Sequence, residues 1–145
     1  MIIDTTYLLP LAKIGVKTDL LRAVVEGRIR REVSLQNLKV NLISLFELQA
    51  KAAKLGVPPR NVAEAISVIL RSFRVIPFHK AEVVETAHKL REILADYIDC
   101  VIVATAITLR EDLVSEDRDI LSHKEELEKR YGIRIHNYQN LLQQT

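Results

Sequence analysis

Short apolar runs alternate along the chain with longer segments whose apolar positions recur every three or four residues. The short runs predict strands at residues 1–3, 38–42, 74–76, 113–115 and 133–135. The longer segments predict helices at residues 7–14, 19–26, 44–55, 58–72, 80–94, 98–109 and 119–130, with a last helical turn or two from residue 137. Helices that alternate with short apolar strands favour an α/β fold. We expect a three-layer α/β/α sandwich with a mainly parallel sheet between the helices.

The predicted helix ends carry local signals. A glycine follows the last apolar position of four predicted helices, which is typical of a helix C-terminus; these are Gly15, Gly27, Gly56 and Gly132. Ser44, followed three residues later by Glu47, predicts a capping box at the start of the third helix. The segment 98–109 is apolar almost all round, so we expect that helix to be buried.

Length and composition indicate one compact domain, residues 1–145. The chain is 48% hydrophobic, which suits a substantial core, and it shows no repeat or linker-like stretch. Cys100 is the single cysteine, so no internal disulfide forms, and its apolar neighbours predict a buried thiol. No signal peptide and no membrane-spanning run is visible, so we expect a cytoplasmic protein. The net charge of +2 does not by itself indicate a nucleic-acid partner.

Acidic residues stand where predicted strands give way to helices. Asp4 follows the first strand, Glu47 lies in the opening turns of the helix after the second, and Asp117 follows the fourth. Sites in parallel α/β sheets form at the carboxyl ends of the strands, so these side chains belong to one crevice. Asp99 lies at the start of the buried helix, where the helix dipole favours a carboxylate. The pattern leaves open at which edge of the sheet that helix starts.

Four segments in a fixed order carry a family resemblance: residues 3–5, 44–48, 99–106 and 113–119. In order and spacing they resemble the PIN-domain nucleases, in particular the small VapC-like ribonucleases, across nearly the whole chain. The resemblance implies a five-stranded parallel sheet of order 3-2-1-4-5. It also implies an endoribonuclease with Mg²⁺ or Mn²⁺ held by four acidic residues, Asp4, Glu47, Asp99 and Asp117. The expected products carry 5′-phosphate and 3′-hydroxyl ends.

The resemblance also assigns supporting residues. Ser115 stands where a small hydroxyl residue accompanies the last carboxylate, and Thr5 where a hydroxyl supports the first. Asp96 and Asp119 are extra acids near the site, of which Asp119 is the better candidate for a fifth ligand. Cys100 departs from the family pattern, which commonly has alanine there.

A cluster of four carboxylates needs a cation. Two like charges ~4 Å apart repel by about 4 kcal/mol at an effective dielectric of 20, and hard divalent ions prefer oxygen ligands. Such an ion can activate a water molecule and neutralise charge on the leaving oxygen of a phosphodiester. We expect Asp4, Asp99 and Asp117 to contact the metal most directly, and Glu47 to hold a second metal or orient the attacking water.

Each residue also has a plain structural interpretation. Asp4 alone is typical of a helix cap, Glu47 of an ion pair with Lys51, and Asp117 of a turn. Several basic residues are candidate contacts for RNA phosphates, although a solvated surface is the commoner explanation for such charges; these are Lys13, Arg28, Arg30, Arg31 and Lys51. The four histidines have no ligand-like spacing and are interpreted as surface or element-end residues.

Three further hypotheses concern role. A non-catalytic PIN-like scaffold that binds RNA or protein has the same fold, and the four acids argue against it. A phospho-acceptor receiver domain is also small and α/β, but residues 77–79 and 136–137 lack the Asp and Lys that it needs. Small stand-alone members of the family are often toxins that an antitoxin protein holds in check, and the resemblance also favours a homodimer.

Overall fold

A computed structural model describes residues 1–143 of the chain. All strands of its five-stranded sheet pair in parallel, in the order β3-β2-β1-β4-β5. Their bounds are β1 (Ile2–Ile3), β2 (Lys39–Asn41), β3 (Arg74–Ile76), β4 (Leu113–Val114) and β5 (Ile135–His136). The predicted strand order is confirmed. It excludes a receiver domain, whose sheet has the order 2-1-3-4-5.

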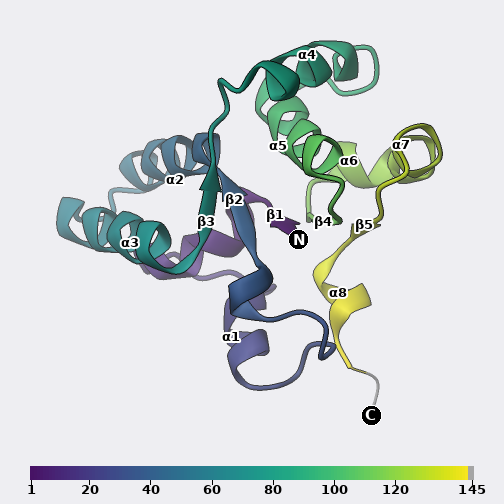
Figure 1. Cartoon of the computed structure of the whole chain (residues 1–145). Coiled ribbons are helices and arrows are strands. Elements are labelled where there is room, and N and C mark those ends of the chain that lie inside the picture. The colour runs from purple at the N-terminus through teal and green to yellow at the C-terminus, as the bar shows by residue number, and fades with distance from the viewer. Residues whose placement is uncertain (144–145) are drawn as a thin grey trace.

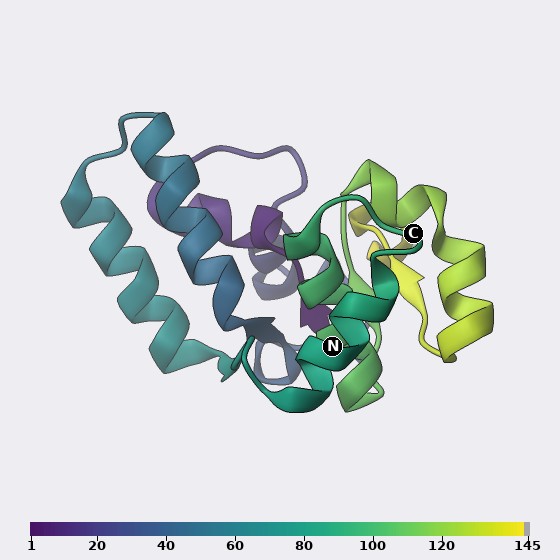
Figure 2. The ribbon, with the colours of Figure 1, turned by 90° about the horizontal axis from the view of Figure 1, so that it is seen from above.

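Helices cover both faces of this sheet (Figure 1). Their bounds are α1 (Leu20–Val25), α2 (Leu42–Lys54), α3 (Pro59–Ser72), α4 (Ala81–Leu90), α5 (Tyr97–Leu109), α6 (Arg118–Ser122), α7 (Lys124–Tyr131) and α8 (Tyr138–Leu141), with 3₁₀ helices η1 (Thr5–Ala12) and η2 (Leu35–Asn37). Seen from above, α2 and α3 lie side by side away from α6 and α7, which are on the other side of the sheet (Figure 2). No helix within residues 1–143 is long and apolar enough to cross a bilayer.

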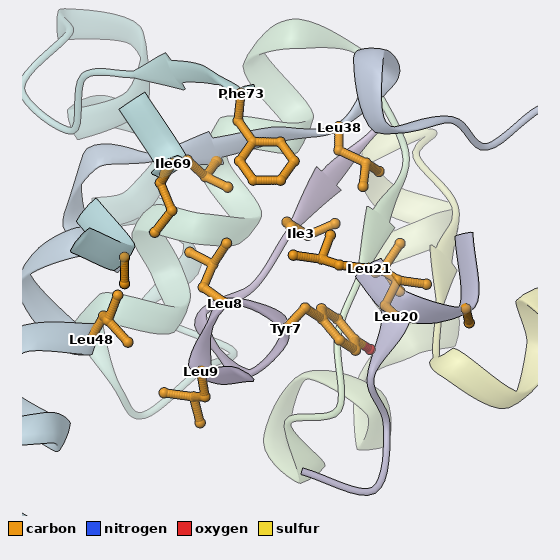
Figure 3. Close-up of a cluster of buried hydrophobic side chains, with 14 of the residues drawn as sticks. Ile3, Tyr7, Leu8, Leu9, Leu20, Leu21, Leu38, Leu48, Ile69 and Phe73 are labelled. Atoms are coloured by element: carbon orange, nitrogen blue, oxygen red, sulfur yellow. The ribbon is translucent and has the colours of Figure 1, made fainter. Parts of the chain in front are cut away.

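The hydrophobic core is split by the sheet into two clusters, as the three-layer prediction requires. Consecutive strand residues point to opposite faces, so Ile3 and Val114 belong to one cluster while Ile2 and Leu113 belong to the other. The first cluster joins η1 and α1 to α2 and α3, and Figure 3 shows Tyr7 and Leu8 of η1 among its buried side chains. The second cluster contains the buried side of α5, from Cys100 to Ala106.

The capping box predicted at Ser44 is wrong. The cap of α2 is Asn41, whose side-chain oxygen accepts a hydrogen bond from the Ile43 N–H at 2.8 Å. The Asn41 amide also donates to the Thr105 hydroxyl at 2.8 Å, which ties the end of β2 to α5 inside the core. Because α2 begins directly where β2 ends, Glu47 lies in its second turn and is free of any capping role.

Two predicted helices differ from those in the structure. The segment predicted as a helix at 7–14 is the 3₁₀ helix η1, which contains Pro10 and ends at Lys13 in the left-handed conformation instead of at Gly15. Proline lacks the N–H that a longer α-helix needs. The segment 119–130 is two helices, α6 and α7, that meet at His123. The Ser122 hydroxyl and His123 Nδ1 each bond the Asp119 carbonyl at 2.9 Å, which competes with a continuous helix.

Candidate active site

The carboxyl edge of the sheet carries the four predicted acids. Asp4 follows β1 directly and caps η1, while Asp117 follows β4 and caps α6 through the Ile120 N–H at 3.0 Å. Glu47 lies in the second turn of α2, and Asp99 is the third residue of α5. Helix α5 ends just before the start of β4, which lies at the amino edge of the sheet. The N-terminus of α5, with Asp99, therefore lies at the carboxyl edge.

All four acids line one hollow of about 390 Å³, here called the acidic hollow. Its remaining lining comes from the start of η1, from the loop after β4 and the start of α6, and from one turn each of α2 and α5: Thr5, Thr6, Lys51, Ile102, Glu116, Arg118 and Asp119. The four predicted acids are up to 113 positions apart in the chain. Only the fold brings them together.

Ser115 connects two of the four acids. Its buried hydroxyl donates to Asp4 Oδ2 at 2.5 Å and accepts a hydrogen bond from the Asp117 N–H at 3.0 Å. Asp4 is only 6% exposed and accepts two further bonds, from the Thr6 N–H at 3.0 Å and the Glu116 N–H at 3.1 Å. The orientation of Asp4 is therefore fixed before any ligand binds.

Burial and mutual repulsion make the acidic hollow costly to ionise. Burial raises the pKa of Asp4 to about 6, although the hydrogen bond from Ser115 opposes the shift. Burial also raises the pKa of Asp99 to about 7, and the charges of Asp117, Asp96, Glu47 and Asp4 add to it. A carboxylate whose ionisation is opposed in this way gains from a nearby cation.

The donor set suits a hard divalent ion. Carboxylate oxygens dominate the lining, and the Thr5 hydroxyl is buried there with no hydrogen-bond partner among the described residues. Within residues 1–143, no three His, Cys, Asp or Glu side chains converge closely enough to ligate one ion in their present positions. The Asp99 carboxylate, unlike that of Asp4, accepts no hydrogen bond from the described residues, so no such bond fixes its orientation.

The two extra acids have different surroundings. Asp119 lines the acidic hollow, but its Oδ2 accepts a hydrogen bond from the Ala95 N–H at 3.1 Å, and its Oδ1 lies 3.4 Å from His123. Asp96 lies outside the lining and caps α5 through the Ile98 N–H at 2.8 Å. Asp119 therefore joins the loop before α5 to α6, next to the four acids.

The basic residues predicted to contact RNA separate into two groups. Lys51 lines the acidic hollow, one helical turn beyond Glu47. The others are not among its lining residues: Lys13 is exposed at the end of η1, Arg28 bonds Glu26 and the Tyr138 hydroxyl, and Arg30 and Arg31 line a separate open hollow beside α8. That these four residues contact RNA phosphates stays a prediction, since none of them lines the acidic hollow.

Glu116 is a residue of the hollow that the sequence interpretation did not single out. Its Oε2 accepts hydrogen bonds from the Tyr7 hydroxyl and, at 2.7 Å, from the Tyr138 N–H. It thereby ties η1 and α8 to the loop that carries Asp117. Its position between Ser115 and Asp117 was the only available signal, since its partners lie over 20 residues away in the sequence. Arg118 was also missed, because its neighbours are acidic.

Replacing Ser115 tests whether its hydroxyl positions Asp4 and Asp117. We expect Ser115→Ala to lower kcat/KM for the metal-dependent RNA cleavage that the family resemblance implies by about 10- to 100-fold, as loss of a partner behind a metal ligand commonly does. Ser115→Thr keeps the hydroxyl and should retain most of the activity. Initial rates on a labelled RNA with Mn²⁺ provide the measurement. Equal rates for Ser115→Ala and the unchanged protein would contradict this role.

Comparisons with known proteins agree with the fold. The family model described as PIN domain matches residues 1–127. No curated protein matches the chain. Among solved structures, a toxin–antitoxin complex from Klebsiella pneumoniae shares 21% identity over 82% of this chain and 88% of its own, with a TM-score of 0.58.

Two other solved structures cover nearly the entire chain. FitAcB from Neisseria gonorrhoeae shares 16% identity over 97% of this chain and 99% of its own, with a TM-score of 0.64. VapBC2 from Rickettsia felis, bound to a DNA fragment from its promoter, shares 18% identity over 94% and 96% of the two chains, with a TM-score of 0.62. At these identities the likeness concerns the fold.

Proposed function

The chain belongs to the PIN domain family, and from this premise we propose that it is a metal-dependent endoribonuclease. The observation that carries the proposal is that Asp4, Glu47, Asp99 and Asp117 line one hollow at the carboxyl edge of the sheet. The raised pKa values of Asp4 and Asp99, which come mainly from burial, support it, because perturbed carboxylates gathered in one hollow are typical of functional sites. Residues 1–145 would act as a single domain, with its core on both faces of one sheet.

The four acids would have different roles. Asp4, Asp99 and Asp117 would hold Mg²⁺ or Mn²⁺, and Glu47 would hold a second ion or orient the attacking water. A divalent ion in such a site supplies a more acidic bound water and neutralises charge on the phosphodiester. Asp4 is preorganised by its three hydrogen bonds. The Asp99 carboxylate, which accepts no hydrogen bond from the described residues, would complete the ligand set.

The remaining lining residues would serve the substrate and the framework. The Thr5 hydroxyl, which is buried without a partner among the described residues, would hydrogen-bond a ligand or water of the metal. Lys51 and Arg118 bring positive charge to an otherwise acidic lining and would bind the phosphates of RNA on either side of the cleaved bond. Asp119 would hold α6 in place, since its oxygens are already bonded to the loop before α5 and to His123.

Metal removal and replacement test the proposal directly. Protein treated with EDTA should not cleave a 5′-labelled single-stranded RNA, and added Mn²⁺ or Mg²⁺ should restore cleavage. The fragments should carry 5′-phosphate and 3′-hydroxyl ends, as shown by their ligation without prior end repair. Cleavage that persists in EDTA, or products that end in a 2′,3′-cyclic phosphate, would contradict it. Binding of RNA without cleavage under all of these conditions would favour a non-catalytic scaffold.

The biological role that we propose is that of a toxin controlled by an antitoxin. The similar structures from Klebsiella pneumoniae and Rickettsia felis belong to a toxin–antitoxin complex and to VapBC2, and their folds cover most of this chain. A homodimer is part of the same proposal. An adjacent gene for a short DNA-binding protein, together with relief of growth inhibition when the two genes are co-expressed, would support this role.

A further inference from the structure

A second hollow lies beside the acidic one and has the opposite character. Its volume is about 360 Å³. It is here called the apolar hollow and is lined by Ile43, Phe78, His79, Val84, Tyr97, Ile98 and Val101. The lining contains no Asp, Glu, Lys or Arg side chain, whereas the acidic hollow contains eight of them.

The two hollows share their supporting helices. On α5, Ile98 and Val101 line the apolar hollow while the next residue in each case, Asp99 and Ile102, lines the acidic hollow. On α2, Ile43 lines the apolar hollow and Glu47, one helical turn later, lines the acidic one. A strand of RNA whose phosphodiester lies among the four acids therefore has this apolar surface within the reach of a neighbouring nucleotide.

Two aromatic side chains that line the apolar hollow, Phe78 and Tyr97, are partly exposed to solvent instead of being buried in the core. Phe78 is 41% exposed and Tyr97 is 42% exposed, among the few large apolar side chains outside the core. Each makes a T-shaped contact with a histidine ring: Phe78 with His79 at a ring-centroid distance of 5.4 Å, and Tyr97 with His88 at 5.5 Å. Aromatic rings that leave a face accessible are the means by which proteins bind unstacked bases of single-stranded RNA.

We propose that the apolar hollow binds one unstacked nucleobase of the RNA substrate, next to the cleaved phosphodiester, with Tyr97 and Phe78 as its stacking residues. The inference rests on the proposed ribonuclease function. A base fits this hollow because the lining is largely apolar and aromatic, while Lys51 and Arg118 in the acidic hollow supply the charge that its phosphates need. Base stacking there would position the backbone and would make cleavage depend on the nucleotide beside the cut.

The test compares three variants by RNA binding and by cleavage. Tyr97→Ala removes the ring, Tyr97→Phe keeps it, and Leu70→Ala removes an exposed apolar side chain on α3 that lines neither hollow. We expect Tyr97→Ala to raise the Kd for a fluorescein-labelled single-stranded RNA in EDTA about tenfold, and to lower kcat/KM with Mn²⁺ by a similar factor. Tyr97→Phe and Leu70→Ala should stay within about twofold of the unchanged protein, with equal circular dichroism throughout.

An RNA series with a single abasic residue at each position in turn completes the design. At the position whose base occupies the apolar hollow, loss of the base should weaken binding to the unchanged protein and leave binding to Tyr97→Ala unaffected. Equal RNA binding by Tyr97→Ala and the unchanged protein overturns the inference, as does a Tyr97→Ala effect confined to the oligomeric state measured by light scattering. Weakened binding by Tyr97→Ala in a protein that never cleaves RNA supports the base site and overturns only the nuclease proposal.

Discussion

Asp99→Asn is expected to lower kcat/KM for Mn²⁺-dependent RNA cleavage by at least about 100-fold, beyond the 10- to 100-fold typical of residues behind a metal ligand. The Asp99 carboxylate accepts no hydrogen bond from the described residues, so we expect it to contribute charge and metal ligation instead of structural support. Asparagine has nearly the same shape and keeps α5 intact. Initial rates at several Mn²⁺ concentrations measure the loss and show whether more metal rescues it.

Asp96→Asn is the matched control for this prediction. Asp96 is three residues away on the same helix, lies outside the lining of the acidic hollow and acts as the cap of α5, a position that asparagine fills equally well. Its replacement removes the same charge without removing a proposed ligand, so activity should stay within about threefold of that of the unchanged protein. Equal losses in Asp96→Asn and Asp99→Asn would show that only the overall charge matters, and would contradict the proposed site.

Raising the pH from 4 to 8 is expected to destabilise the metal-free protein. The pKa of Asp4 is about 6 in the fold against 3.8 ordinarily, and that of Asp99 is about 7. Well below pH 3.8 both groups are protonated in the folded and the unfolded chain, so neither affects the free energy of unfolding. Between pH 4 and 7 the unfolded chain releases protons that the fold retains, so stability is lost as the pH rises. The raised pKa of Asp4 alone lowers the free energy of unfolding by about 3 kcal/mol at pH 8.

A metal ion should reverse this loss, because it stabilises the ionised carboxylates of the folded chain. Thermal unfolding in EDTA should show the midpoint falling by several degrees between pH 4 and pH 8. Mn²⁺ should restore it at pH 8 and have little effect at pH 4. Such stabilisation follows from binding to the folded state alone.

The Asp99→Asn variant separates this effect from other titrations. In EDTA at pH 8 its midpoint should exceed that of the unchanged protein by about 3 °C, since one repelled charge is gone, while at pH 4 the two should coincide. Added Mn²⁺ should stabilise the variant much less. A midpoint for the unchanged protein that rises with pH in EDTA, or an equal Mn²⁺ effect at pH 4 and pH 8, would contradict the linkage.

Much of the fold is predictable from local patterns, since each strand is short, apolar and bounded by clear breaks. The predicted strand at 74–76 and the helix at 58–72 agree closely with β3 and α3. The errors fall where side chains compete for backbone groups. Asn41 caps α2 in place of Ser44, and the bonds of Ser122 and His123 to the Asp119 carbonyl break a helix that hydropathy alone makes continuous.

The sequence by itself determined that Asp4, Glu47 and Asp117 gather at one edge, because each closely follows a strand and all the strands are parallel. Only the tertiary structure decided the side on which Asp99 lies, since two helices, α4 and α5, intervene between β3 and β4 and their directions depend on how they pack. It also decided that Glu116 holds Tyr7 and Tyr138, and that Lys51 but not Arg30 lines the acidic hollow. Periodicity reports which face of an element is buried, whereas contacts between distant elements arise from the packing of helices on the sheet.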